Sequence, residues 1–252
     1  MAVTVQQIAQ LIDQMAPFDT AVSYDNVGLL VGHPDSQVDK ILVALDLTMG
    51  AIEEAQQMRA QLIVTHHPVM FHARKNLRED EAEGALLCAL VRSGIAMIAA
   101  HTNFDAARGG VSEVLAETVG ITNLEPIADG LVTIGDYDGT LDKLMQDVRA
   151  LINPNARLYG KDKPLKRVAA CGGAGSDFWI HAQQAGADAY LLGEVRHYDA
   201  LAAVQSGMPL IDAGHYETER LSLKALVHGL QTRANELQYN VRVQESEYEP
   251  FL

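Results

Sequence analysis

Short apolar segments alternate with amphipathic segments along the first half of the chain, and this alternation is the feature that most limits its fold. Residues 40–46, 61–65 and 94–100 are apolar runs of strand length, whereas residues 47–60 and 80–93 repeat apolar side chains at helical spacing. Strands joined by helical connections pair in parallel, because the helix returns the chain to the same edge of the sheet. The sequence therefore predicts an α/β fold with a largely parallel or mixed sheet.

The second half of the chain repeats this rhythm after a turn-rich passage at residues 123–130. Apolar runs at 131–135, 167–173, 188–194 and 209–214 alternate with helical patterns, the last of which begins at about residue 216. We therefore expect two similar α/β lobes, residues 1–126 and 127–252, packed as one unit. We also expect a site at the carboxyl ends of the parallel strands, between the lobes.

Composition narrows the class of protein. Hydrophobic residues make up 48% of the 252 residues, yet no apolar run approaches the roughly 18 residues of a membrane span. Acidic residues outnumber basic ones by 33 to 19, and the resulting net charge of −14 argues against a nucleic-acid partner. The amphipathic N-terminal segment does not resemble a signal peptide, and Cys88 and Cys171 lie far apart in apolar surroundings. We therefore expect a cytoplasmic protein that does not bind a membrane.

Two adjacent histidines follow the apolar run at residues 62–65, in the stretch QLIVTHHPVMF. Pro68 cannot donate to a strand ladder, so the strand ends near Thr65 and delivers His66 and His67 at its carboxyl end. This edge of an α/β sheet is where ligands usually bind. The pair either forms part of a site or serves the turn itself, with one imidazole capping the strand and the other in solvent.

Two more strand ends deliver the same kinds of side chain. The stretch AMIAAHTNFDAARGG places His101 and Asp105 after a strand, in what Asn103 and the two glycines predict to be a loop. The stretch PLIDAGHYETER places His215 and Glu219 four residues apart, on one face of the first turn of the last helix.

Imidazole and carboxylate ligands suit zinc, iron, manganese or nickel, and the absence of thiolates among them argues against a structural zinc site. Five ligands exceed the need of one open catalytic metal, so we expect two divalent cations per subunit, about 3.5 to 4 Å apart. The alternative is a set of unrelated turn histidines with acidic neighbours. The predicted ligands are His66, His67, Asp105, His215 and Glu219.

Four stretches in the same order, SYDNVGLLVG, THHPVMF, AHTNFDAARGG and DAGHYETE, resemble the GTP cyclohydrolase 1 type 2 homologues, also called the Nif-three-like dinuclear metal proteins. The resemblance runs from about residue 5 to the C-terminus. It implies two similar lobes, a toroidal homohexamer and a dinuclear metal centre in each subunit. It also implies that the five residues named above are the ligands and that Glu219 bridges the two metals.

Several neighbouring residues have open roles. Glu194 and His197 follow a strand and could transfer protons, or could serve as a helix cap and a surface histidine. We expect His101 to orient a ligand or substrate without binding the metals itself. The glycine-rich turn Gly172–Gly175 is favoured as a tight structural turn, with Ser176 or Asp177 capping the next helix, over an anion site. Asp46 and Thr48 follow the apolar run ILVAL and could both border the ligand-binding edge of the sheet, but Thr48 also suits a plain helix cap.

These observations favour a dinuclear-metal-dependent hydrolase resembling GTP cyclohydrolase 1 type 2. A hydroxide on the metals would attack a nucleotide or similar small substrate; for GTP it would open the imidazole ring and release formate. A metal-dependent phosphoesterase would use the same ligands. The alternative from another class is a metal chaperone, insertase or storage protein without turnover.

Overall fold

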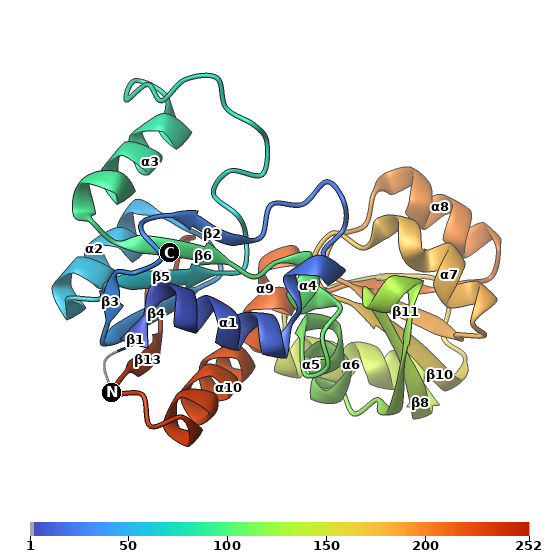
Figure 1. Ribbon diagram of the computed structural model, residues 1–252. Coiled ribbons are helices and arrows are strands. Elements are labelled where there is room, and N and C mark those ends of the chain that lie inside the picture. Colours follow the sequence, from blue (N-terminus) through green and yellow to red (C-terminus); the bar gives the residue numbers. More distant parts are fainter. Residues whose placement is uncertain (1–2, 252) are drawn as a thin grey trace. The chain divides into compact units, whose positions relative to one another are not determined.

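The computed structural model describes residues 3–251, which divide into two compact α/β units (Figure 1). Unit 1 contains the chain up to Phe104 and from Leu223 onward, and unit 2 contains residues 105–222. The predicted α/β fold with two lobes is therefore confirmed, but the units differ from the expected division at residue 126. The expected boundary falls inside unit 2, and the C-terminal segment belongs to unit 1.

Strand pairing explains why the division differs. The turn-rich passage contains strand β7 (Thr122–Ile127), which pairs antiparallel with β8 (Val132–Thr140) of unit 2. Strand β13 (Arg242–Glu245) pairs in parallel with β4 (Lys40–Ala44) and so returns the end of the chain to unit 1. The pairing of β13 with β4 joins segments that are far apart in the sequence and has no signature in the local hydrophobic pattern.

The sheet of unit 1 has the strand order β13-β4-β5-β6-β2. Its three middle strands, β4, β5 (Leu62–Thr65) and β6 (Ala96–Ala99), are parallel and buried along almost their whole length. The edge strand β2 (Gly28–Val31) runs antiparallel to β6. A separate short ladder joins β1 (Val3–Thr4) to β3 (Gln37–Val38).

Helices α2 (Met49–Met58) and α3 (Ala82–Ser93) bury their apolar faces against one face of this sheet, around Ile63 and Met97. Thr48 accepts a hydrogen bond from the Ala51 amide at 3.0 Å, so its interpretation as a helix cap is confirmed. Helix α1 (Val5–Met15) begins with a capping box between Thr4 and Gln7 and packs with α10 (Leu223–Glu236). A 3-10 turn, η1 (Phe18–Thr20), follows α1.

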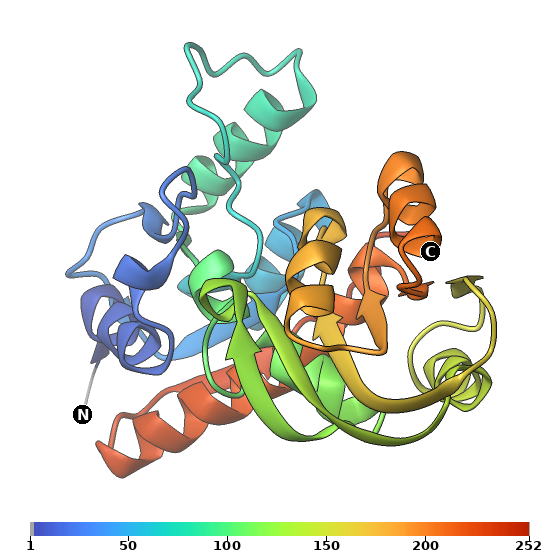
Figure 2. The same cartoon turned by 90° about the vertical axis from the view of Figure 1, so that its right-hand side faces the viewer.

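The connection from β5 to α3, residues 66–81, contains no helix or strand and protrudes beyond the sheet edge (Figure 2). Its first part is held by the Asn26 side chain, whose amide donates to the Met70 carbonyl at 2.7 Å. The loop is therefore held in place at Met70, shortly after the histidine pair His66 and His67.

The sheet of unit 2 has the order β7-β8-β10-β11-β12-β9. Strands β10 (Pro164–Cys171), β11 (Ala189–Leu192) and β12 (Leu210–Asp212) are parallel, whereas β7, β8 and β9 (Arg157–Tyr159) pair antiparallel. The sheet is thus mixed, and its parallel core carries the strand ends that precede Gly172, Gly193 and Ala213.

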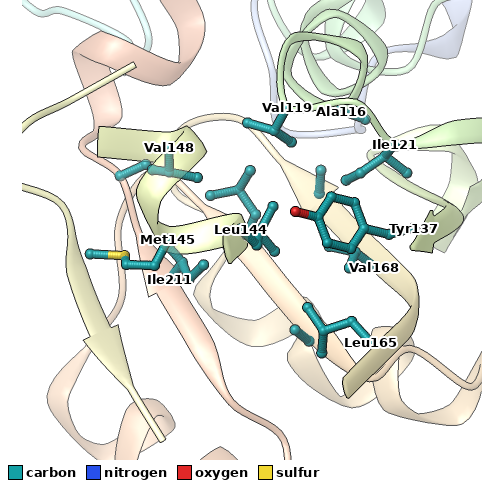
Figure 3. Close-up of a cluster of buried hydrophobic side chains, with 14 of the residues drawn as sticks. Ala116, Val119, Ile121, Tyr137, Leu144, Met145, Val148, Leu165, Val168 and Ile211 are labelled. Carbon is teal, nitrogen blue, oxygen red and sulfur yellow. The ribbon is translucent and has the colours of Figure 1, made fainter. Parts of the chain in front are cut away.

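Both faces of this sheet are covered by helices. A buried cluster that includes Leu144, Val148 and Tyr137 packs α5 (Val111–Thr118) and α6 (Leu141–Leu151) against one face (Figure 3). A second cluster on the other face includes residues of α7 (Trp179–Gln184) and α8 (His197–Gln205). The remaining short helices are α4 (Thr102–Asp105), η2 (Ala128–Gly130), η3 (Ser176–Phe178), α9 (His215–Glu219) and η4 (Arg220–Ser222).

Among the described residues, none of the helices combines the length and the apolar character that a membrane crossing requires.

Candidate metal centre

The histidine pair of unit 1 lies where the sequence predicts, at the carboxyl end of β5. The His66 and His67 amides donate to the carbonyls of Ala44 and Leu45 at 3.2 and 3.0 Å, so the backbone stays in register with β4 just past the strand. The His66 side chain is buried and that of His67 is half-buried. Two imidazoles are therefore fixed at the edge of a parallel sheet.

Each of these rings is oriented through its Nδ1 atom. His66 Nδ1 lies 2.9 Å from the Ala100 carbonyl oxygen, and His67 Nδ1 lies 2.7 Å from Asp46 Oδ1. A carbonyl or an ionised carboxylate only accepts, so in both rings Nδ1 donates and Nε2 carries the lone pair that a metal can take. Asp46 thus orients a histidine, a role that the sequence left open.

His101 has the same arrangement, with a partner that the sequence analysis did not single out. Its Nδ1 lies 2.8 Å from Oδ1 of Asp25, whose side chain is fully buried. Burial acts to raise the pKa of Asp25, but hydrogen bonds from His101 and Thr102 outweigh it and lower that pKa well below its usual range. Asp25 is therefore a carboxylate that accepts from His101.

Antiparallel pairing explains why Asp25 was missed. Gly28 in β2 is paired with Ala99 in β6, so the residues that precede β2 lie beside those that follow β6. The expected parallel rhythm does not contain this edge strand. Had the antiparallel register been known, the acidic residue of SYDNVGLLVG would have been placed next to His101.

The three histidines of unit 1 form one group. The ring centroid of His66 lies 5.0 Å from that of His67 and 5.1 Å from that of His101. The centroids of His67 and His101 are 5.4 Å apart. Each ring offers one nitrogen, and the three nitrogens lie within 4.8 Å of one another. The donor set could hold a divalent cation.

Residues 102–105 form the helical turn α4, so the predicted loop at this position is wrong. The Asn103 side chain accepts from the His101 amide at 2.9 Å and donates to the Ala16 carbonyl at 2.7 Å. Asp25 accepts from the Thr102 amide at 3.0 Å. These side chains cap a turn that sequence periodicity cannot reveal, and the turn ends at Asp105.

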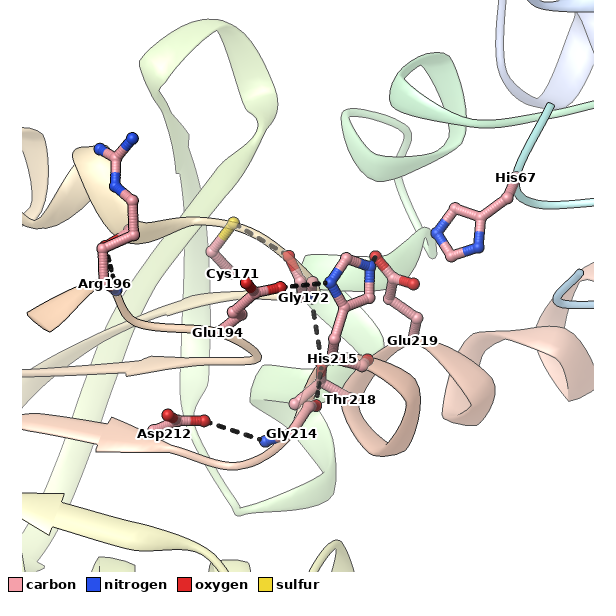
Figure 4. Close-up of polar contacts among 12 residues, drawn as sticks. His67, Cys171, Gly172, Glu194, Arg196, Asp212, Gly214, His215, Thr218 and Glu219 are labelled. Atoms are coloured by element: carbon pink, nitrogen blue, oxygen red, sulfur yellow. Dashed lines mark hydrogen bonds and ion pairs between the residues drawn. The ribbon is translucent and has the colours of Figure 1, made fainter. Parts of the chain in front are cut away.

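In unit 2, α9 presents His215 and Glu219 from consecutive turns, as predicted (Figure 4). Gly214 precedes them with φ +91°, a conformation that favours glycine, so the chain turns sharply from β12 into the helix. His215 Nε2 lies 3.1 Å from Glu219 Oε1, and His215 Nδ1 lies 3.1 Å from Glu194 Oε2. Glu194 therefore orients His215 as Asp46 orients His67.

The glycine-rich turn after β10 makes room for the Glu219 carboxylate. Gly173 has φ +60°, and a Cβ atom built on it would lie 2.0 Å from Glu219 Oε1 and 3.2 Å from His215 Nε2. The Gly173 amide donates to Thr218 Oγ1 at 3.1 Å, which fixes the turn against α9. Only a residue without a side chain fits here, so the turn forms a wall of the candidate centre.

Asp105 lies near the same turn. The pKa of Cys171, which is buried beneath the turn, is raised to about 12 by burial and then by the negative charge of Asp105, with a smaller effect of Glu219. Both carboxylates are thus close to Cys171. In unit 2, His215 and Glu219 are in direct contact, and the charges of Asp105 and Glu219 both act on Cys171.

Two other expectations concern residues beside this group. Ser176 Oγ donates to Asp199 Oδ2 at 2.7 Å and accepts from the Arg196 amide at 2.9 Å, so Ser176 ties the turn to the start of α8 instead of capping η3. His197 is exposed at the start of α8, where its ring packs edge-on against Tyr198. A catalytic role for His197 or Glu194 stays a prediction.

The fold and the donor groups define an α/β protein with groups of imidazoles and carboxylates that can hold metal ions. Comparison with known proteins gives the family. A profile described as Duf34/NIF3 (NGG1p interacting factor 3) matches residues 3–250, and the chain belongs to this family.

Relatives and solved structures agree with this membership. A protein of Clostridium perfringens named GTP cyclohydrolase 1 type 2 homolog is 30% identical over 223 residues, which cover 84% of this chain and 85% of the relative. One of the same name from Lactococcus lactis is 32% identical over 212 residues, covering 81% and 82%. The crystal structure of a hypothetical protein of Staphylococcus aureus has a TM-score of 0.92 and 29% identity, covering 99% of this chain and 98% of that chain.

Proposed function

We propose that this protein is a dinuclear-metal-dependent hydrolase resembling GTP cyclohydrolase 1 type 2. The observation that carries the proposal is the repeated pairing of a histidine with a carboxylate at its Nδ1 atom: Asp46 with His67, Asp25 with His101, and Glu194 with His215. Such partners are typical of metal-binding histidines, because they fix the tautomer and aim Nε2. Histidines that only shape a turn would not need a carboxylate at Nδ1, and here three histidines each have one.

Two divalent cations of zinc, iron, manganese or nickel are proposed, held by the five ligands expected from the sequence. When bound, the cations would lower the pKa of water and polarise an electrophilic carbon or phosphorus atom. The proposed ligands are His66, His67, Asp105, His215 and Glu219.

Glu219, Glu194 and His197 have different proposed roles at the centre. Glu219 is only 3% exposed and is enclosed by Gly172 and Gly173, which suits a carboxylate that holds one fixed position between two cations. The Glu194 side chain is 60% exposed while it contacts His215, so it can exchange protons with solvent at the edge of the centre. Glu194 and His197 are the proposed proton-transferring residues.

The substrate is proposed to be a nucleotide or a similar small molecule, and the names of the relatives direct the first test to GTP. Metal-loaded wild-type protein and the Glu219→Ala variant are incubated with a panel of nucleotides and phosphoesters, and products are followed by mass spectrometry. We expect formate and a ring-opened nucleotide from GTP with the wild-type protein and neither with the variant.

Other results would redirect the proposal. Release of inorganic phosphate would indicate a metal-dependent phosphoesterase built on the same ligands. An inert panel, together with transfer of metal from the loaded protein to an apo-acceptor, would refute turnover and favour a metal chaperone, insertase or storage protein. The Leu151→Ala variant is the control, because this exposed residue at the end of α6 is not among the proposed ligands or proton-transferring residues.

A toroidal homohexamer in the cytoplasm completes the proposal, and the resemblance described above supports it. Light scattering under native conditions should give about six times the chain mass of 27.3 kDa. A mass near that of one chain would refute this part of the proposal without touching the metal centre.

A further inference from the structure

We propose that the connection from β5 to α3 binds the substrate, with a planar ring against Phe71 and Tyr24 and a phosphate group on Lys75. This inference rests on the proposed function, because it names the substrate class of the same centre: an aromatic ring system joined to a phosphate. None of the three side chains is among the proposed metal ligands. The inference is carried by a cavity, two exposed aromatic rings and one lysine, all in unit 1.

A cavity of about 350 Å³ lies in the loop that follows the histidine pair and protrudes beyond the sheet edge in Figure 2. Its wall is formed by residues 68–76, with Glu81 and Glu83 on the far side of the loop. Cavities of roughly 300–1,000 Å³ are typical of small-molecule sites. Pro68 directly follows His67 in the chain, so the wall of the cavity starts at the residue after a proposed metal ligand.

The Phe71 ring connects the cavity to the histidines of unit 1. It lines the cavity and packs edge-on against His101, with ring centroids 5.9 Å apart. The Tyr24 ring packs edge-on against Phe71, with centroids 6.2 Å apart. Phe71 is 38% exposed and Tyr24 is 71% exposed. Exposed aromatic rings grouped beside a site offer faces on which a planar ligand ring can stack.

The backbone next to each of these rings is held by a hydrogen-bonded neighbour. The Met70 carbonyl, directly before Phe71, accepts from the Asn26 side chain at 2.7 Å. Tyr24 directly precedes Asp25, whose side chain is fully buried and hydrogen-bonded. A surface that is already ordered loses less conformational entropy when a ligand binds. The two rings therefore form a preorganised platform beside His101.

The two basic side chains of the cavity differ in their partners. Arg74 pairs with Glu81 at 3.2 Å and also with Glu83, so it fastens the loop to the start of α3. Lys75 is exposed and makes no ion pair with any of residues 3–251. It is therefore the cation of the cavity that a phosphate can approach. Because the whole chain has a net charge of −14, an anionic ligand needs such a local cation.

The test compares binding of GMP with binding of guanosine, which lacks the phosphate, by isothermal titration calorimetry of the metal-loaded full chain. Phe71→Ala and Tyr24→Ala each remove an aromatic face, so each should weaken both ligands by roughly 5–100-fold. Phe71→Tyr keeps the ring and should keep the affinity. Lys75→Ala should weaken GMP by about 5-fold and leave guanosine unchanged, because the lysine contacts only the phosphate.

Each variant has a matched control and a check on folding. Leu77→Ala removes an exposed apolar side chain of the same connection that lies outside the cavity wall, and Lys224→Ala removes an exposed lysine of α10. Circular dichroism and elemental analysis compare the fold and the metal content of all the variants. Tyr24→Ala keeps the test independent of the metal centre, because the Tyr24 ring packs on Phe71 and not on a histidine.

The inference is overturned if the wild-type protein binds neither ligand, or if Phe71→Ala and Tyr24→Ala bind both ligands as tightly as Leu77→Ala. It is also overturned if Lys75→Ala keeps the wild-type preference for GMP over guanosine. Binding that depends on these residues, without conversion of any substrate, would refute hydrolysis and still support the inference. Turnover of GTP that none of these substitutions affects would do the reverse.

Discussion

Substitution of Gly173 by alanine should damage the metal centre more than the fold. The new Cβ would lie 2.0 Å from Glu219 Oε1 and 2.9 Å from its Cδ, far inside van der Waals contact, so the carboxylate has to move. Glu219 is buried at 3% exposure and has little room to do so. The backbone at φ +60° adds strain of roughly 1–2 kcal/mol for a residue with a side chain.

Gly186→Ala provides the matched control, because Gly186 also has a positive φ, +83°, but a Cβ there would meet nothing within 4 Å. This variant should show the backbone strain alone, about 1–2 kcal/mol, or a fall in Tm of roughly 2–8 °C at about 2–4 °C per kcal/mol. Gly173→Ala should lower Tm further and should retain at least one metal equivalent less than the control.

The assay combines thermal unfolding with metal analysis after loading and dialysis of both variants under the same conditions. If Gly173→Ala retained as much metal as Gly186→Ala and melted at the same temperature, the turn would not be shaping the centre. The assignment of Gly173 as the wall beside Glu219 would then be refuted.

Three further predictions follow from other parts of the site. Removal of metal by a chelator should lower Tm, because a ligand that binds only the folded state stabilises it by about 2.7 kcal/mol at 100 times its Kd; an unchanged Tm in differential scanning calorimetry would contradict this. Asp46→Asn should weaken metal binding by about 10–100-fold by disturbing the hydrogen bond at His67 Nδ1, whereas Asp35→Asn, at an exposed site near His33, should leave it unchanged in the same dialysis experiment. Burial and the charge of Asp105 raise the pKa of Cys171 to about 12, so its thiol stays protonated and unreactive at pH 8. In the Cys88→Ser variant, Cys171 is the remaining cysteine, and the native protein should resist alkylation as counted by mass spectrometry. Rapid labelling would contradict the burial of this thiol.

The sequence was sufficient to predict the strands that carry the site. His66 and His67 follow a short apolar run whose length favours a buried strand, and Pro68 limits how far that strand can extend. His215 and Glu219 are four residues apart after a glycine, so their common face follows from helix geometry. In these cases the positions depend on local periodicity, which a single sequence displays.

Pairing between distant segments was not predictable in the same way. Asp25 reaches His101 only because β2 is antiparallel to β6, and the C-terminal segment joins unit 1 only because β13 pairs with β4. The helical turn that ends at Asp105 depends on hydrogen bonds that the Asn103 and Asp25 side chains accept from the backbone, and such side chains in isolation favour loops. Each of these features results from a tertiary contact and leaves no periodic pattern in the sequence.

The central claim is that the five proposed ligands hold two divalent cations, and bound metal per chain tests it most directly. Wild-type protein is stripped, loaded with Zn²⁺ or Mn²⁺, freed of excess metal and measured by elemental analysis against protein concentration. We predict about two equivalents per chain in the wild-type protein, and we expect both to be lost together in the variants His67→Ala and Glu219→Ala. One equivalent or less in fully loaded wild-type protein would contradict the dinuclear centre.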